Sequence, residues 1–211
     1  MSRASLFRSP SSTTDTERPA NPAIPIIALT LCAACAQAAA GRFEGVYASV
    51  AGAGVLSLDP WDGTSFGHSV EARLGYSFAA PIAAYLSAAL DSAYPRREEL
   101  GFPPRVYRVL HLAPAFQYRP WSWSTGAFYV RGAVGLSRVT NVEAADQTGR
   151  VNAAIGLSAG AGFGVELALT RDLFLAPEIF YRNGNFASRS SFVASETNVQ
   201  TAGLQLGLVY Y

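Results

Sequence analysis

The stretch that decides the fold is Ile155 to Leu169, I-G-L-S-A-G-A-G-F-G-V-E-L-A-L. Its odd-numbered positions are all apolar, whereas its even-numbered positions are glycine, serine, alanine or glutamate. This period of two predicts a β-strand, because a helix would spread both sets around its axis and bury Glu166 among leucines. The alternation lasts about fifteen residues, well beyond the five or six that are usual in soluble proteins. A tilted strand with lipid on one side and a polar lumen on the other requires this length and pattern.

The composition of the chain agrees with a β-protein that spans a membrane. The chain has 211 residues, of which 50% are hydrophobic and 15% are charged, and its formal net charge is +1. After Gly41 no apolar run reaches the roughly 18 residues that a membrane helix needs, so this part can span a bilayer only as strands. This net charge near zero argues against a nucleic-acid partner.

The N-terminal segment has the features of an export signal. Residues 1–22 are polar and rich in Ser, Thr and Pro, and the apolar segment Ala23–Ala36 is followed by Q-A-A-A-G. We predict a signal peptide with a long disordered n-region over residues 1–40, cleaved near Ala39 or Gly41; an uncleaved membrane anchor is the alternative. Both cysteines, Cys32 and Cys35, would be lost with it, so the mature chain would hold no thiol or disulfide. Residues 41–211 are then predicted to form one barrel domain.

Alternating segments recur at regular spacing along residues 41–211. The predicted strands are Gly45–Ser57, Gly67–Phe78, Ile82–Ala93, Arg105–Tyr118, Thr125–Val139, Ala153–Leu169, Leu173–Asn183 and Val199–Tyr211. Eight is an even number, as closure of an outer-membrane barrel demands. Short connections follow the second, fourth and sixth strands, and longer ones follow the others. This predicts an all-β, eight-stranded antiparallel transmembrane β-barrel with short periplasmic turns, longer extracellular loops and both termini in the periplasm.

Aromatic residues gather near the predicted periplasmic ends of the strands. They are Tyr76, Phe78, Phe116, Tyr118, Trp121, Trp123, Phe128 and Tyr210. Such a set is typical of the girdle that marks one membrane interface. Two prolines depart from the pattern, since Pro114 and Pro177 each remove a hydrogen bond from a sheet without edges. We expect a bulge or a local distortion at each.

With these features the chain resembles the eight-stranded outer-membrane β-barrels similar to the OmpA transmembrane domain and OmpX. The resemblance covers Gly41 to Tyr211 and rests on topology, on the Gly-rich strands and on the closing strand A-G-L-Q-L-G-L-V-Y-Y, Ala202–Tyr211. It implies residence in the outer membrane, contact with outer-membrane lipids and insertion by the barrel-assembly machinery through the C-terminal strand. In that family the last residue is usually a lipid-facing aromatic. Here the alternation places Tyr210 on the lipid side and leaves Tyr211 one residue out of step.

The same alternation predicts eight titratable side chains in the lumen. They are Glu71, Arg73, Asp91, His111, Arg131, Glu166, Glu178 and Arg182. An eight-stranded barrel is just wide enough for side chains to fill, so a water-filled pore is not expected. Because charges removed from water must be paired, we expect a salt-bridge network. The glycine face of Ala153–Leu169 would then receive Tyr129, Arg131, Phe174, Phe180 and Arg182, unless it leaves a cavity for an acyl chain.

The sequence offers little for catalysis. Some eight-stranded outer-membrane proteins modify lipid A with a serine and a histidine, but His68 and Ser69 are neighbours on one strand and must point to opposite faces. No metal-ligand cluster or phosphate loop occurs, so neither a cofactor nor a metal is expected. We predict a monomeric, non-enzymatic structural or adhesion scaffold. A barrel that binds lipid or an acyl chain, or modifies lipid A, is the alternative.

Recognition of an extracellular ligand is expected in the loops, because exposed loops on a rigid scaffold usually carry it. The predicted loops are Leu58–Phe66, Ala93–Pro104, Thr140–Asn152 and Gly184–Asn198. None of them contains a motif that identifies a ligand.

Overall fold

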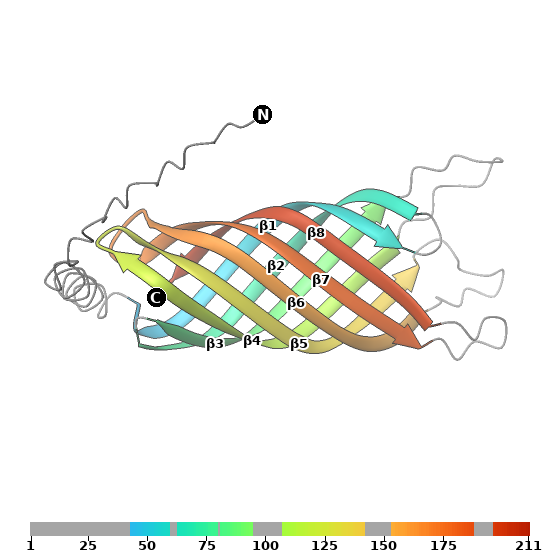
Figure 1. Cartoon of the computed structure of the whole chain (residues 1–211), viewed down its shortest axis with the longest axis horizontal. Helices are drawn as coiled ribbons and strands as arrows, with labels where there is room; N and C mark the ends of the chain where they lie inside the picture. Colours follow the sequence, from blue (N-terminus) through green and yellow to red (C-terminus); the bar gives the residue numbers. More distant parts are fainter. Residues whose placement is uncertain (1–42, 60–62, 80, 95–106, 142–152, 188–195) are drawn as a thin grey trace, which may run out of the picture.

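The computed structural model describes residues 43–59, 63–79, 81–94, 107–141, 153–187 and 196–211. They form eight strands: β1 (Gly45–Asp59), β2 (Gly63–Ala79), β3 (Ile82–Tyr94), β4 (Tyr107–Trp123), β5 (Gly126–Asn141), β6 (Ala153–Ala168), β7 (Leu173–Ala187) and β8 (Glu196–Tyr210). Each strand pairs antiparallel with its neighbours in the sequence, and β8 pairs with β1, so the sheet is a closed barrel (Figure 1). The predicted all-β fold is confirmed. None of the described residues forms a helix with the length and apolarity needed to cross a membrane.

The two ends of the barrel differ in their connections. At one end, which we call the turn end, short links join β2 to β3, β4 to β5 and β6 to β7, and the C-terminus lies there (Figure 1). The Gly45↔Ser77 pair places the start of β1 at the same end. The other four connections leave from the opposite end, which we call the loop end. This is the sidedness of an outer-membrane barrel, with short periplasmic turns and longer loops outside.

Two predicted connections are wrong, because the strands continue through them. The expected loop Leu58–Phe66 is largely strand, since β1 and β2 stay paired as far as Asp59↔Gly63. The expected turn from Arg119 to Ser124 is mostly the end of β4, which pairs with β5 as far as Trp123↔Gly126 after a register shift between Tyr118 and Trp121. The inside-outside alternation continues as far as Arg119 on β4, and beyond the register shift Trp121 faces outward. Part of the expected loop Gly184–Asn198 is also strand, and residues 1–40 with the remaining loop segments lie outside the described residues.

The bulges expected at the two prolines are absent, but the sheet is locally distorted beside each. Within the described ladders, Ala113 and Pro114 lack partners on β5, and Ala176 and Pro177 lack partners on β6. Around Pro114 the β4–β5 register is the same before and after, with Leu112↔Leu136 on one side and Ala115↔Ala133 on the other. Pro177 stays in continuous register with β8, where it pairs with Leu206. Both prolines face outward, where their rings meet lipid rather than the packed lumen. A register shift does occur near the turn between β2 and β3, at Ser77/Ala79.

Side chains alternate between the outer surface and the lumen. The outward set is apolar over the middle of the barrel; Leu157 and Leu204 are each 68% exposed. Near the turn end it is aromatic, with Tyr76, Phe78, Phe116, Tyr118, Trp121, Phe128 and Tyr210 all exposed. An apolar band next to an aromatic girdle is what the outer surface of a transmembrane barrel requires.

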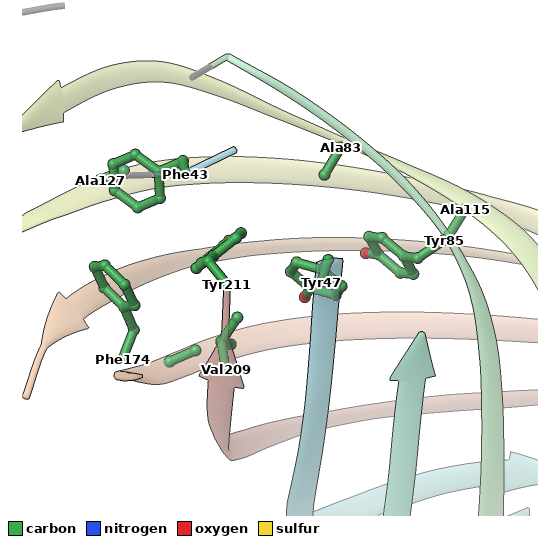
Figure 2. Packing of buried hydrophobic residues seen from close by; sticks show 10 residues of the cluster. Phe43, Tyr47, Ala83, Tyr85, Ala115, Ala127, Phe174, Val209 and Tyr211 are labelled. Carbon is green, nitrogen blue, oxygen red and sulfur yellow. The ribbon is translucent and has the colours of Figure 1, made fainter. Parts of the chain in front are cut away.

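Inside the barrel, two apolar clusters lie near the two ends. The turn-end cluster consists of Phe43, Tyr47, Ala83, Tyr85, Ala115, Ala127, Phe174, Ala176, Val209 and Tyr211 (Figure 2). The loop-end cluster consists of Ala93, Tyr107, Val109, Val139, Phe186 and Val199. In the turn-end cluster Tyr211 contacts Phe43 and Phe174 edge to face, with ring centroids 5.4 Å apart in both pairs. Most charged residues of the lumen lie between the two clusters, whereas Arg119 and Glu166 lie beside the turn-end cluster.

Candidate functional site

All eight predicted lumen residues are buried, and none is more than 6% exposed. Glu71 and Arg73 lie on β2, Asp91 on β3, His111 on β4, Arg131 on β5, Glu166 on β6, and Glu178 and Arg182 on β7. The structure brings seven of them into one network, which we call the central network. Glu166 stands apart from it and binds other partners.

Glu71 is the hub of the central network. Its carboxylate accepts hydrogen bonds from three guanidinium groups, at 2.9 Å from Arg73 Nη2, 3.2 Å from Arg131 Nη2 and 2.6 Å from Arg182 Nη2. The Ser87 hydroxyl donates a further bond at 2.5 Å. A single carboxylate therefore ties together residues of β2, β3, β5 and β7 across the lumen.

Glu178 is the second carboxylate at the centre of the barrel. It accepts hydrogen bonds from Arg73 Nη2 at 3.0 Å, from Arg131 Nε at 2.6 Å and from the Tyr129 hydroxyl at 2.7 Å. Arg73 and Arg131 are thus shared between two acids. Charge-assisted bonds of this kind are the stronger ones, and sharing leaves neither carboxylate unpaired in the dry interior.

Asp91 extends the central network toward the loop end. It accepts a hydrogen bond from Arg182 Nη1 at 2.8 Å and lies 3.4 Å from His111 Nε2. Among the acids and arginines the charges balance, because three carboxylates (Glu71, Asp91, Glu178) face three guanidinium groups (Arg73, Arg131, Arg182). Balance matters because a buried charge without a partner is strongly destabilising.

A small cavity adjoins the His111 side of the central network. It has a volume of about 20 Å³ and is lined in part by His111, Ser158, Gly160 and Arg182. Both ring nitrogens of His111 and one carboxylate oxygen of Asp91 lack a hydrogen-bond partner among the described residues. A volume of this size holds about one water molecule, which these polar atoms could bind. It is too small for an acyl chain.

Glu166 belongs to a separate polar group near the turn end. Its carboxylate accepts hydrogen bonds from Arg119 Nε at 2.8 Å, Gln117 Nε2 at 2.8 Å and the Tyr211 hydroxyl at 2.6 Å. Arg119 also donates to the Tyr211 hydroxyl. Burial raises the pKa of Tyr211 well above its ordinary value, so the hydroxyl remains protonated and can act as a donor. Arg119 supplies the positive charge that balances Glu166.

Sequence reasoning missed Arg119, Gln117 and Tyr211 as lumen residues. Arg119 was expected in a turn, although the odd positions of β4 run inward without interruption from His111 to Arg119. Following that alternation to its end would have found it. Tyr210 faces outward as predicted, while Tyr211, one residue out of step, turns inward and packs on Phe43.

The glycines of β6 make room for the large lumen side chains. A Cβ atom added at Gly162 would lie 2.4 Å from Glu178 Oε1, and one added at Gly164 would lie 2.6 Å from the Tyr129 ring. The glycine wall therefore receives Tyr129, Arg131 and Glu178. Small residues opposite large ones are how a narrow barrel packs its interior.

The residues considered for catalysis do not come together. His68 faces outward and its Nδ1 lies 3.3 Å from the Tyr94 hydroxyl, whereas Ser69 is buried in the lumen and bonds Arg182 at 3.1 Å. The two point to opposite faces, as neighbours on a strand must. Within the described strands, no three His, Cys, Asp or Glu side chains lie close enough to hold a metal ion.

Comparisons with known proteins place this architecture in a family. Neisserial surface protein A shares 16% sequence identity at a TM-score of 0.58, over 78% of this chain and 96% of that chain. Ail, the attachment invasion locus protein of Yersinia pestis, shares 13% identity at a TM-score of 0.44, over 79% and 99%. The outer membrane enzyme PagL shares 11% at a TM-score of 0.44, over 75% and 97%. At these identities the likeness concerns the fold alone.

Curated protein sequences give no match to this chain. The family model of the outer membrane protein beta-barrel domain, however, matches residues 26–211, which is most of the chain. This match agrees with the closed eight-stranded barrel, its apolar outer band and its short turns at one end. The chain therefore belongs to the outer membrane protein beta-barrel family, and its location is the outer membrane.

Proposed function

We propose that the protein is a non-enzymatic, monomeric scaffold of the outer membrane that binds an extracellular partner through its loops. The observation that carries this proposal is the filled lumen. The central network crosses the barrel between the turn-end and loop-end clusters, and its charges are paired with one another. A lumen of this kind gives the barrel rigidity and leaves the loops as the surface on which recognition can act.

A lipid A-modifying enzyme is the competing function, and the geometry gives it little support. A serine–histidine mechanism needs both side chains within hydrogen-bond reach of each other. His68 and Ser69 lie on opposite faces of β2, and His111 faces Asp91 inside the sealed lumen, away from any lipid substrate. Mass spectrometry of lipid A from cells with and without the protein should show the same acyl pattern. A shift of one acyl chain that is lost in His68→Ala would favour the enzyme.

The filled lumen is tested by conductance. The purified barrel in a planar bilayer should give no steady channel, because ions would have to cross two apolar clusters and a paired charge network. A porin of known conductance in the same bilayers serves as the control for insertion assays. A steady open channel of porin size from the folded barrel would contradict the proposal.

The role of the loops is tested by shortening them. Variants in which segments 95–106, 142–152 and 188–195 are each replaced by a two-residue turn should keep the heat-modifiable mobility of a folded barrel. Cells that display these variants should lose adhesion to matrix-coated surfaces relative to cells that display the full chain. Equal adhesion by both would show that the loops do not carry recognition.

A further inference from the structure

Two arginines face outward near the loop end of the barrel, on the side that meets the membrane. Arg108 is the second residue of β4, and Arg138 is the fourth residue from the end of β5; both are exposed. The register pairs Arg108 with Thr140 and Leu110 with Arg138. The two arginines are therefore diagonal neighbours on adjacent strands, roughly 7–8 Å apart, a separation that long side chains can bridge.

The outward residues of β4 and β5 show at which depth in the membrane Arg108 and Arg138 lie. From the loop end, β4 presents Arg108, Leu110, Leu112, Pro114, Phe116 and Tyr118, and β5 presents Arg138, Leu136, Val134, Gly132, Val130 and Phe128. Each strand thus runs from arginine through an aliphatic middle to an aromatic end. The middle is the apolar band, and the aromatic end is the girdle of the turn end. The arginines accordingly lie at the opposite membrane interface.

Other outward residues also indicate that the membrane interface lies at this height of the barrel. Tyr94 and Phe66, paired at the loop ends of β3 and β2, are 48% and 53% exposed. His68 lies in the same cross-strand row as Arg108, through the pairs His68↔Ser92 and Ser92↔Arg108. A tyrosine such as Tyr94 lies where its ring meets lipid and its hydroxyl meets the polar headgroups.

Neither guanidinium has an ion-pair partner among the described residues. The carboxylates described on the strands around them, such as Asp91, face the lumen, and the exposed Asp172 lies at the turn end. Charged side chains on the lipid face are costly at the midplane and tolerated at the interface. Two arginines at the membrane interface, without an ion-pair partner in the part of the chain that the structure describes, favour an anionic group supplied by the membrane itself.

We propose that Arg108 and Arg138 bind the phosphate groups of a phosphorylated glycolipid of the outer leaflet, of the lipid A class. The loop end of an outer-membrane barrel faces outside, so the lipid beside these residues belongs to the outer leaflet. A guanidinium can donate two parallel N–H bonds to one phosphate. Glutamine has no charge, and lysine attracts a phosphate as a point charge without this two-bond geometry. The inference rests on the membrane orientation and is independent of what the loops recognise.

The test is native mass spectrometry of the folded barrel with added lipids. The wild type should retain diphosphoryl lipid A, and the double variant Arg108→Gln/Arg138→Gln should bind it roughly tenfold more weakly, since each loses a charge-assisted bond. Arg171→Gln, which removes an exposed arginine at the turn end, should bind as the wild type does. If the double Gln variant fails to fold, Arg108→Lys/Arg138→Lys keeps the charge and should show an intermediate loss.

Further binding measurements distinguish lipid A from other sources of phosphate. Dephosphorylated lipid A should bind no better to the wild type than to the double Gln variant, and millimolar inorganic phosphate should not displace diphosphoryl lipid A. Equal retention of phosphatidylglycerol, displacement by inorganic phosphate, or equal affinity of the wild type and the double Gln variant would each overturn the assignment. Because the loops are unchanged in every variant, these results are separable from the adhesion assay.

Discussion

At the scale of single residues, the wall of β6 limits what the lumen can hold. A Cβ added at Gly164 would lie 2.6 Å from the Tyr129 ring and 2.7 Å from the Pro177 carbonyl oxygen. The hydrogen bond from the Tyr129 hydroxyl to Glu178 fixes the ring, and the carbonyl is part of the backbone of β7. Neither group can therefore move away easily from an added Cβ. A side chain at this position must therefore push two strands apart.

Gly164→Ala should lower the free energy of unfolding by about 1–3 kcal/mol, the usual cost of overpacking a filled interior. This change in free energy is measured by urea titration of the barrel in lipid vesicles, in which the folded fraction is followed by its heat-modifiable mobility in gel electrophoresis. Gly132→Ala is the matched control, because a Cβ there meets nothing within 4 Å. Both changes restrict the unfolded chain equally, so their difference isolates packing. Equal stability of the two variants would contradict the close packing at Gly164.

At the scale of strands, the period of two was enough to predict which side chains face the lumen. It could not predict where strands end, because a ladder continues for as long as the neighbouring strand offers partners. A turn was expected after Tyr118, yet β4 shifts register and continues to Trp123. Nor could it predict which acid meets which arginine. Glu71 and Arg182 lie 111 positions apart in the chain, and only the closed sheet brings them to 2.6 Å.

The lipid-facing register of β8 can be tested with one arginine. Leu206 is 56% exposed and pairs with Gly52 and Pro177 in the interior of the sheet. Leu206→Arg should cost about 2–4 kcal/mol in bilayers, since it places a charge in the hydrocarbon region. Leu169→Arg, at an equally exposed position in the turn after β6, should cost about 0–1 kcal/mol. Vesicle unfolding titrations that give the same cost for both would show that the register is wrong.

At the scale of the whole molecule, the lumen is layered from one end to the other. The turn-end cluster is followed by the central network and then by the loop-end cluster. Apolar layers exclude water from the charges, which strengthens each pairing and also raises the cost of any charge left alone. The stability of the barrel therefore depends on the balance of charge in the network more than on the number of its bonds.

This dependence on balance gives a prediction for the hub. Glu71→Gln leaves three guanidinium groups facing two carboxylates and should cost about 3–5 kcal/mol, as breaking a buried pair does. The exposed Asp172→Asn, whose partner Arg171 is 4.0 Å away, should cost almost nothing. The double variant Glu71→Gln/Arg73→Gln removes one charge of each sign and leaves Arg131 and Arg182 facing Glu178 and Asp91. It should therefore be more stable than Glu71→Gln alone in the same vesicle titration. A double variant that is less stable than the single one would show that individual hydrogen bonds, rather than charge balance, hold the lumen together.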